Sequence, residues 1–572
     1  MLNLDLENNS GSYRLQLPVK PRGTFNDVDQ DGKKDGGVQI FAVEYAPNIA
    51  QDPFYQGDDR YKGWPGYLAS VIIDRENQDE VNGGRLLIWA PDEDQQFPSG
   101  FGADGLLFTP DDPQAGVPAG YTVVDLDQEP FLFLQDASVE LTLYEPADAA
   151  VKDFSDQKYS QAFDSMFEIV KKEYAFNGIE GKQPEWDKLY QEIFPKVQQA
   201  EKDKSAEDFY MALHEFTMNF KDGHVGLDGG EIGNQYTAGV ISTGYGFAIR
   251  ELDDGKVIAV YVSPDSAADM FGIQEGTEIT EFNGEPIGTA IGNTSVLEPQ
   301  STDFALRYQQ ARYLLRAPLG TTATVTFLDP GSGESVEVPL KAVDEYTSFS
   351  ATSLFNAYDP NVLPVEYQIL DSGIGYVRVN SNYDDLNLIK RLFERALFTF
   401  EQNQVAGIII DMRLNFGGSP MDLAGFLTEE KIPLGQLEYY SDQTENFEAD
   451  GPPSTLLPST RQFRFPKMAL LVDQSCYSAC EIEAYAFSQV RGMEVFGMYP
   501  TAGVEAETAR GNFLLPEDFS LTIPTGRFTL PDGSIFLEGV GVQPTVRIPI
   551  DEETVLSEED LVLQEAEAYI LK

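Results

Sequence analysis

Apolar and polar residues alternate in several distinct patterns along the chain. Short apolar runs such as Val38–Val43, Tyr67–Ile73, Leu86–Trp89 and Val139–Leu143 are separated by clusters of Gly, Pro and Asp. Short runs bounded by turn residues are typical of β-strands. We therefore expect residues 1–148 to form an all-β accessory domain.

Helical spacing begins after Pro146. Three segments repeat apolar residues every three or four positions: FSDQKYSQAFDSMFEIVKKEYAF, WDKLYQEIFPKVQQA and SAEDFYMALHEFTMNF. Ser205 followed by Asp208 is a helix-capping signal at the start of the third segment. We expect residues 149–235 to contain a small helical bundle.

The C-terminal half contains two further patterns. Residues 236–343 are β-rich, whereas residues 344–572 alternate strand-like runs such as AGIIIDMR and KMALLVDQ with helix-like runs such as CEIEAYAFSQVRG. Alternating strands and helices predict an α/β core with a partly parallel sheet. The expected fold class is therefore multidomain α+β, as a chain of 572 residues requires.

The charge is strongly negative. The chain has 94 acidic and 39 basic residues, a formal net charge of −55. Binding nucleic acid requires clustered Lys and Arg, so this composition argues against a nucleic-acid partner and against anionic membranes. No segment approaches the length of a transmembrane helix. The first residues lack a basic region followed by an apolar run, so we expect an extracytoplasmic protein whose leader is not part of this chain.

The chain has two cysteines, Cys476 and Cys480. If their segment is helical, both side chains lie on one helical face, where a disulfide between them is poorly placed. We therefore expect no disulfide framework.

Ser478 is the first candidate for chemistry. A buried strand is expected to end at Asp473, and a helix to begin near Ser478 after a short turn. A serine at a strand-to-helix turn is exposed, and the following amide points into the site. The simpler interpretation is that Ser478 and Glu481 form an ordinary capping box.

Two other segments change the balance between these interpretations. Asn415-Phe416-Gly417-Gly418 follows a strand and suits a backbone that approaches another group closely. The chain has two histidines: His224 lies in the turn after a helix, and His214 lies within that helix and is expected to be structural.

Several motifs resemble peptidase family S41, the tail-specific or C-terminal processing proteases, over roughly residues 150–549. They are Asp222-Gly223-His224, Asp411-Met412-Arg413-Leu414-Asn415-Phe416-Gly417-Gly418, Ser478-Ala479-Cys480-Glu481, Pro500-Thr501-Ala502-Gly503 and Glu538-Gly539-Val540-Gly541-Val542-Gln543-Pro544. The resemblance implies a serine endopeptidase and places the α/β core, residues 344–572, in the ClpP/crotonase-like type. It implies no cofactor for catalysis.

The family uses two catalytic arrangements, and this chain resembles the second. The first pairs the serine with a lysine in a Thr-x-Gly-Lys-Gly turn, but the matching turn here is Pro-Thr-Ala-Gly-Val-Glu and the only lysine after Ser478 is Lys572. The second, tricorn-like arrangement implies His224 as base, Ser478 as nucleophile and Glu538 as a third group. The tricorn pattern has a serine before the histidine where this chain has Gly223.

General acyl-transfer chemistry then assigns the steps. Neutral His224 accepts the proton of Ser478, and an acyl-enzyme forms and is hydrolysed by water. The resemblance implies an oxyanion hole made by the backbone amides of Ala479 and of Gly417 or Gly418.

Residues 236–343 contain motifs that resemble a PDZ domain. Gly244-Tyr245-Gly246-Phe247, Pro264-Asp265-Ser266-Ala267-Ala268, Gly272-Ile273-Gln274-Glu275-Gly276 and Phe282-Asn283-Gly284 occur in the expected order. PDZ domains add a C-terminal peptide as a strand and hold its carboxylate with loop amides. The resemblance implies that Gly244, Tyr245, Gly246 and Phe247 form that loop, and that the partners are proteins or peptides with accessible C-termini.

An acidic segment near the N-terminus predicts a calcium site. Asp27, Asp29, Asp31 and Asp35 surround a glycine, and carboxylates so arranged suit Ca²⁺. Asp104, Asp111 and Asp112 form a weaker candidate. The alternative is a solvated acidic turn.

Two other functions compete with the protease. The first is a catalytically silent peptide- or ligand-binding protein on the same scaffold, because fold does not fix function. The second is a structural calcium-binding surface protein with a PDZ adaptor. The ordered motifs around Ser478, His224 and Glu538 favour the enzyme.

Overall fold

The chain divides into two compact units in the computed structural model. The structure describes residues 2–5, 10–29, 36–45, 68–74, 80–135, 139–144, 151–354, 362–384, 386–419 and 422–572. One unit comprises Met1–Asn48, Gln56–Val151 and Ser441–Asn446, and the other comprises Ile49–Tyr55, Lys152–Tyr440 and Phe447–Lys572.

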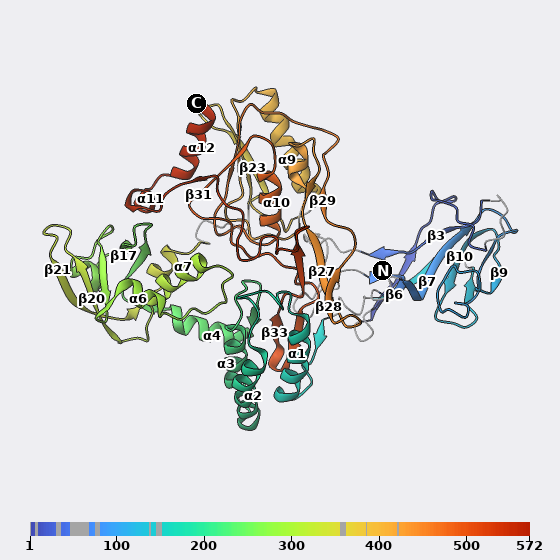
Figure 1. Ribbon diagram of the computed structural model, residues 1–572, viewed down its shortest axis with the longest axis horizontal. Helices are drawn as coiled ribbons and strands as arrows, with labels where there is room; N and C mark the ends of the chain where they lie inside the picture. The colour runs from blue at the N-terminus through green and yellow to red at the C-terminus, as the bar shows by residue number, and fades with distance from the viewer. Residues whose placement is uncertain are drawn as a thin grey trace. The chain divides into compact units, whose positions relative to one another are not determined.

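The first unit, blue in Figure 1, is built from two β-sheets and a hairpin. One sheet has the order β1-β2-β12-β5-β4 and the other β11-β10-β7-β3, with β6 paired to β7. Alternating residues of the long strand β7 enter different clusters, with Ile88 in one and Leu87 in the other. The strands are β1 (Asn3–Asp5), β2 (Ser10–Leu15), β3 (Gln39–Phe41), β4 (Glu44–Tyr45), β5 (Leu68–Ala69), β6 (Val71–Asp74), β7 (Glu80–Ala90), β8 (Gln96–Pro98), β9 (Gln114–Gly116), β10 (Gly120–Asp125), β11 (Leu132–Leu134) and β12 (Val139–Tyr144).

The second unit begins with a helical region. The predicted helices are confirmed as α1 (Tyr159–Glu173), α2 (Trp186–Asp203) and α3 (Ala206–Thr217). The predicted cap is confirmed too, because the Ser205 side chain accepts a hydrogen bond from the Asp208 amide. A further helix, α4 (Gly230–Ile241), follows the short strand β14 (Gly226–Asp228).

This helical region packs against strands from the far end of the sequence. β13 (Lys152–Asp153), β32 (Asn512–Leu515), β33 (Phe519–Thr522) and β14 form one sheet in that order. In Figure 1 the red strand β33 lies among the green helices, and Phe513, Phe519 and Leu521 join the same apolar cluster as Phe163 and Phe216. The region around residues 174–224 is thereby tied to the C-terminal part of the chain.

Residues 243–352 form a β-rich region with short helices. The sheets are β15-β22, β16-β17 and β19-β18-β20-β21. The elements are β15 (Thr243–Gly244), β16 (Phe247–Glu251), β17 (Val257–Val262), α5 (Ala267–Met270), β18 (Ile279–Phe282), β19 (Glu285–Pro286), α6 (Ile287–Gly292), α7 (Asp303–Leu314), β20 (Thr322–Leu328), β21 (Ser335–Lys341), β22 (Val343–Asp344) and α8 (Thr347–Ala351).

The core of the second unit is a six-stranded mixed sheet, β23-β24-β25-β30-β31-β35. β23 pairs antiparallel with β24, and every later pair is parallel. The bounds of its main elements are β23 (Val365–Ile369), β24 (Gly375–Val379), α9 (Leu386–Gln402), β25 (Ile408–Asp411), β30 (Met468–Leu471), α10 (Ala479–Ser488), β31 (Met493–Gly497), β35 (Val546–Arg547) and α12 (Leu561–Leu571).

Both faces of this sheet are buried. Ile408 and Ile410 of β25 pack with residues of α9 and α10, whereas Ile409, between them, packs with residues of α12. Continuous apolar runs such as Ile408–Ile410 are typical of parallel strands that are covered on both sides. The α/β alternation predicted from the sequence is thus confirmed.

The remaining elements lie between β25 and the C-terminus. They are η2 (Leu423–Phe426), β26 (Ile432–Pro433), β27 (Gln436–Ser441), β28 (Asn446–Ala449), β29 (Thr455–Leu456), η3 (Pro516–Asp518), β34 (Gly526–Thr529) and α11 (Glu552–Leu556).

Candidate active site

Ser478 occupies a sharp turn between β30 and α10. Its backbone angles are φ 53° and ψ −125°, a conformation that L-residues other than glycine rarely adopt. The helix starts at the next residue, so the amide of Ala479 has no acceptor within the helix. A strained serine between a strand and a helix, followed by a free amide, is the geometry of a nucleophile elbow.

The capping-box interpretation of Ser478 is wrong. The Ser478 side chain makes no cap hydrogen bond. Glu481 instead turns inward, where its carboxylate accepts hydrogen bonds from the Thr501 hydroxyl and from the amides of Gly503 at 2.8 Å and Val504 at 2.6 Å. The turn that Glu481 fixes also supplies the carbonyl of Val504, which accepts the Ser478 amide at 2.9 Å.

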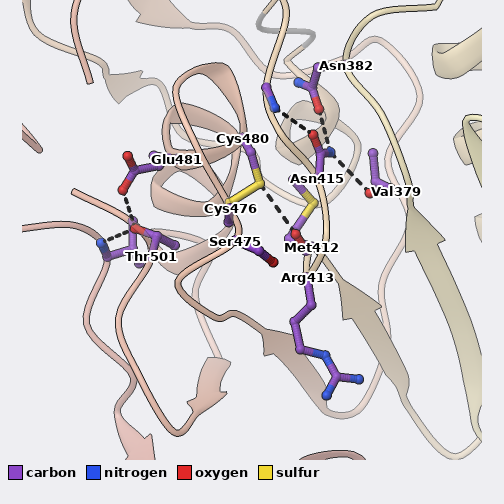
Figure 2. The surroundings of a disulfide bond; sticks show 12 residues. Val379, Asn382, Met412, Arg413, Asn415, Ser475, Cys476, Cys480, Glu481 and Thr501 are labelled. Atoms are coloured by element: carbon purple, nitrogen blue, oxygen red, sulfur yellow. Dashed lines mark hydrogen bonds between the residues drawn. A yellow bond between two sulfur atoms is a disulfide. The ribbon is translucent and has the colours of Figure 1, made fainter. Parts of the chain in front are cut away.

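Cys476 and Cys480 form a disulfide, contrary to the expectation from the sequence (Figure 2). The expectation assumed that both residues lie in a helix, but α10 begins at Ala479 and Cys476 therefore lies in the preceding turn. Their Cα atoms are 5.4 Å apart, within the usual range for a disulfide. The bond closes a small loop around Ser478, and both cysteines are fully buried.

The glycine loop packs directly against the serine. A Cβ on Gly417 would lie 2.9 Å from the Ser478 Cβ, so only glycine allows this approach. Asn415 shapes the loop: its Nδ2 donates to the Val379 carbonyl, and its Oδ1 accepts the Gly417 amide at 3.0 Å (Figure 2). Because the Gly417 amide is committed to Asn415, Gly418 is the better candidate for the second oxyanion donor.

Ser478 and His224 line the same cavity. It has a volume of about 380 Å³ and is also lined by Gly418, Val504 and Glu507, among others. Burial lowers the pKa of His224 to about 4, so its imidazole is neutral at pH 7. A neutral imidazole beside a serine is the state that a general base requires.

Asp222 and Glu538 lie next to His224. One ring nitrogen of His224 and one carboxylate oxygen of each acid lie within 4.8 Å of one another. The Asp222 carboxylate accepts the His224 amide at 2.9 Å through Oδ1. Its Oδ2 and the His224 Nδ1 are both buried without a hydrogen-bond partner. Such unpaired atoms are costly in a stable core.

Lys182 joins this acidic cluster from the helical region. Its ammonium group lies 2.5 Å from Glu538 Oε1 and also donates to the carbonyls of Lys221 and Ser301. Its side chain is 12% exposed and that of Glu538 is fully buried. An imidazole and two carboxylates can also bind a metal ion, but here the positive charge beside the carboxylates of Asp222 and Glu538 is the Lys182 ammonium group.

The electrostatics of the acids follow from this burial. Burial raises the pKa of Asp222 to about 6, opposed by the His224 amide and by Lys182. Burial and the nearby Asp222 also raise the pKa of Glu538, which Lys182 opposes. The second oxygen of Glu538 accepts the Glu505 amide at 2.8 Å, so Glu538 is held on both sides.

The space beside Gly223 is filled by Val504. A Cβ on Gly223 would lie 2.8 Å from Val504 Cγ2, which explains why no serine side chain fits there. Ser301 approaches the same point from elsewhere, and its Oγ accepts the Gly223 amide at 2.8 Å. Sequence reasoning missed Ser301 and Lys182 because neither stands in a local motif.

The other predicted site residues do not line this cavity. Gly244 ends β15, Tyr245 and Gly246 follow it, and Phe247 begins β16. The Gly246 amide donates to Glu345 at 3.3 Å. In the predicted calcium site, Asp27 and Asp29 lie in a loop of the first unit, whereas Asp31 and Asp35 lie outside the described residues. Asp111 and Asp112 accept hydrogen bonds from nearby loop amides, including those of Ala103 and Phe108.

The cavity brings together a serine, an imidazole and backbone amides, which are the groups that acyl transfer by a serine hydrolase needs. A family model for peptidase family S41 matches residues 373–548, which include every strand of the six-stranded sheet except β23, the glycine loop, Ser478 and Glu538. The match covers less than half of the chain, so the similarity to this family is shown for residues 373–548. In the part of the chain that the structure describes, no helix is long and apolar enough to cross a membrane.

Two relatives are informative. The chain is 21% identical over 301 residues to the carboxy-terminal processing protease CtpB of Bacillus subtilis (strain 168). That match covers 52% of this chain and 53% of CtpB, so the chain spans about half the length of this relative. The crystal structure of mature CPAF has a TM-score of 0.51 and 14% identity, over 73% of this chain and 96% of CPAF. The likeness to CPAF shows the fold alone.

Proposed function

We propose that this protein is a serine endopeptidase that processes other proteins near their C-termini. The observation that carries the proposal is the position of Ser478, which stands in a strained elbow on the wall of a cavity that it shares with a neutral His224. Serine, base and a neighbouring amide donor are the parts that acyl transfer needs.

The mechanism follows from these parts. His224 takes the proton of the Ser478 hydroxyl as its oxygen attacks the peptide carbonyl, and the amides of Ala479 and Gly418 receive the negative charge. His224 then protonates the leaving amine, and water hydrolyses the acyl-enzyme. Asp222 lies beside the imidazole, where its carboxylate stabilises the imidazolium, and Lys182 and Glu538 hold the carboxylate cluster in place.

The C-terminal specificity rests on two supports. One relative is a carboxy-terminal processing protease by name. The PDZ-like motifs in residues 236–343 favour recognition of an extended C-terminus. The proposed substrates are therefore proteins with accessible, flexible C-terminal segments.

An extracytoplasmic location is part of the proposal. The disulfide between Cys476 and Cys480 supports it, because disulfides form and persist in oxidising compartments.

A structural calcium ion at the Asp27–Asp35 loop stays a prediction, and a melting temperature that is unchanged by chelation with EDTA would contradict it.

A serine-reactive fluorophosphonate probe tests the proposed chemistry. We expect the probe to label Ser478, and Ser478→Ala to abolish both labelling and cleavage of an unfolded protein substrate. Ser488→Ala is the matched control, because Ser488 lies on the same helix and its hydroxyl only contacts the Tyr485 carbonyl and Gln489. An unlabelled wild-type protein would instead favour a silent binding protein on this scaffold.

A further inference from the structure

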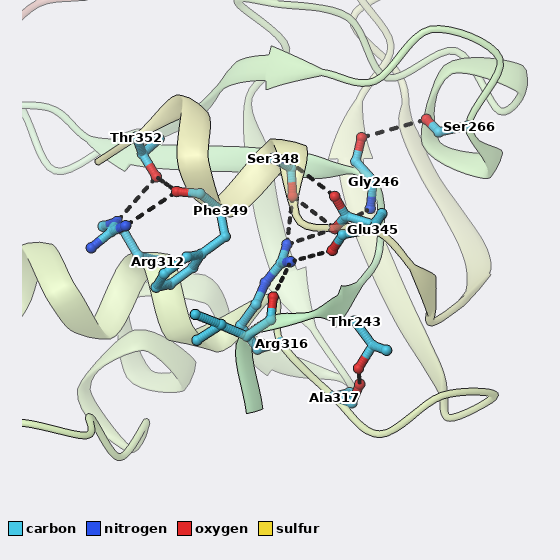
Figure 3. A network of polar contacts seen from close by, with 11 residues as sticks. Thr243, Gly246, Ser266, Arg312, Arg316, Ala317, Glu345, Ser348, Phe349 and Thr352 are labelled. Carbon is cyan, nitrogen blue, oxygen red and sulfur yellow. Dashed lines mark hydrogen bonds and ion pairs between the residues drawn. The ribbon is translucent and has the colours of Figure 1, made fainter. Parts of the chain in front are cut away.

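The segment of residues 343–352 lies on the region predicted to bind C-terminal peptides (Figure 3). It begins as β22, which pairs antiparallel with β15 just before the Gly244–Phe247 loop. It continues as α8, which lies against β16 and β17. We call this segment the strap.

The strap places a carboxylate at the loop. Glu345 Oε1 accepts the Gly246 amide at 3.3 Å and the Ser348 hydroxyl at 2.8 Å, and Oε2 accepts the Ser348 amide at 3.1 Å. The Arg316 guanidinium lies 2.8 Å from the same carboxylate, and its side chain is only 2% exposed. The loop therefore holds an anion, and the anion comes from the chain itself (Figure 3).

The strap also packs against α7. The Phe349 ring packs on Tyr313 of α7 with centroids 5.2 Å apart, and the Arg312 guanidinium lies 4.1 Å from the Phe349 ring centre. Arg312 also donates to the Phe349 carbonyl at 3.1 Å. Phe349 thus anchors α8 to α7.

One edge of β16 has no strand beside it among the residues that the structure describes. Within the described residues, the sheet that contains β16 has one other strand, β17. An open strand edge can accept an extended peptide by backbone pairing, and a loop that holds a carboxylate at the end of that edge fixes a peptide C-terminus. Because α8 is helical, it covers β16 without pairing along it.

We infer that the strap is an internal ligand that occupies the C-terminus-binding groove and that a substrate C-terminus must displace it. This inference rests on the proposed recognition of C-termini. Glu345, Ser348 and Phe349 hold the strap through their side chains, whereas Val343, Asp344, Tyr346, Thr347 and Ala351 are exposed. Backbone contacts hold it too: β22 pairs with β15, and the Glu345 amide donates to the Ser242 carbonyl at 2.9 Å. In this arrangement Glu345 and a terminal carboxylate compete for the same amide and the same guanidinium.

The competition has a simple consequence for affinity. A tethered ligand is present at a high effective concentration, so an external peptide binds the closed protein weakly. The apparent dissociation constant is the intrinsic one divided by the fraction of molecules whose strap is released. Weakening the strap should therefore tighten peptide binding, and it should do so only for peptides with a free carboxylate.

Peptide binding to strap variants tests this inference. The background is Ser478→Ala, so that the peptide is not cleaved, and the probe is a fluorescein-labelled decapeptide that ends in valine with a free carboxylate. We expect Glu345→Gln to tighten binding by about tenfold or more, because it leaves the Arg316 guanidinium without its anion. Phe349→Ala should act in the same direction, and Glu337→Gln on β21 is the matched control.

Three results of these measurements would contradict the inference. Equal affinities in the background, both strap variants and the control would overturn the inference, as would equal gains for a C-terminally amidated peptide. If the variants are unstable, hydrogen exchange in the background protein decides: saturating peptide should speed exchange at residues 346–352, and slower exchange would contradict displacement. Fluorophosphonate labelling of Ser478 reports the proposed hydrolase separately, whatever the strap does.

Discussion

Lys182 places a largely buried positive charge beside the cluster of His224, Asp222 and Glu538. Breaking a buried ion pair leaves an uncompensated charge, which typically costs about 3–5 kcal/mol. We expect Lys182→Met to lower the free energy of unfolding by about 3 kcal/mol and to slow Ser478 labelling, measured by denaturant titration and by fluorophosphonate kinetics. Because Lys182 lowers the pKa values of Asp222 and Glu538, the labelling profile should also move to higher pH.

Two comparison variants sharpen that test. Lys182→Arg keeps the charge and should retain more activity than Lys182→Met. Lys188→Met removes a lysine whose side chain is 72% exposed and pairs only with an exposed Glu185, so it should change nothing. A Lys182→Met protein with an unshifted pH profile would show that the lysine serves folding alone.

The pH dependence of the serine reaction should report His224 and Asp222 separately. Burial lowers the pKa of His224 to about 4 and raises that of Asp222 to about 6. As pH rises, the base is freed first and the carboxylate that stabilises its imidazolium is charged second. We therefore expect the labelling rate to rise in two steps, near pH 4 and pH 6, when it is measured from pH 3.5 to 8.

The variant Asp222→Asn distinguishes the titration of His224 from that of Asp222. In this variant the upper step should disappear, while the lower step remains because His224 is unchanged. A single step near 6.5, the ordinary pKa of histidine, in the wild-type protein would contradict the buried, neutral base described above.

At the scale of elements, the disulfide holds the turn that carries Ser478. Closing so short a loop removes chain entropy worth about 2 kcal/mol from the unfolded state. We expect the double variant Cys476→Ala/Cys480→Ala to lose about that stability and to label at least about tenfold more slowly, since small misplacements of a reacting group are costly. Thermal melting and labelling kinetics measure the two effects.

Chemical reduction of the disulfide in the folded protein can be compared with its removal in the double variant. Both cysteines are fully buried, so dithiothreitol should not reduce the bond until the protein unfolds. Rapid loss of labelling in mild reductant under native conditions would show that the turn opens more readily than its burial suggests.

The elements themselves were largely predictable from the sequence. The periodicity of residues 159–217 and the apolar runs around Ile408 and Leu470 depend on local spacing, so the helices and strands occur where expected. The disulfide was mispredicted because the exact start of α10 decides it, and helix boundaries depend on tertiary contacts such as those of Glu481. Lys182 and Glu538 are 356 residues apart, and no local pattern links them.

At the scale of the whole molecule, the site is assembled from distant segments. The sheet β13-β32-β33-β14 joins the helical region to the C-terminal part of the chain. That junction lies close in sequence to His224, which precedes β14, and to Val504, which precedes β32. The sequence motifs identified His224, Ser478 and Glu538 one by one, but only the folded chain shows that Lys182 and Ser301 belong with them.

The large negative charge should act on substrates before they reach the cavity. With a net charge of −55, the protein repels acidic chains and attracts basic ones over distances of about 10 Å at 0.1 M salt. Glu507 on the cavity wall adds a local negative group. We therefore expect the proposed protease to prefer basic substrates, through faster association and not through faster chemistry.

Two peptides that differ only at positions remote from the cleaved bond, one carrying lysines and the other glutamates, measure this effect. At 20 mM salt the value of kcat/KM should be about tenfold or more higher for the lysine peptide, because steering raises association rates by 10-fold to 1,000-fold. Since salt screens exposed charges, the ratio should fall towards one at 0.5 M NaCl, while kcat stays equal for both peptides. A ratio that is unaffected by salt would place the preference in direct contacts within the cavity and not in the field of the whole molecule.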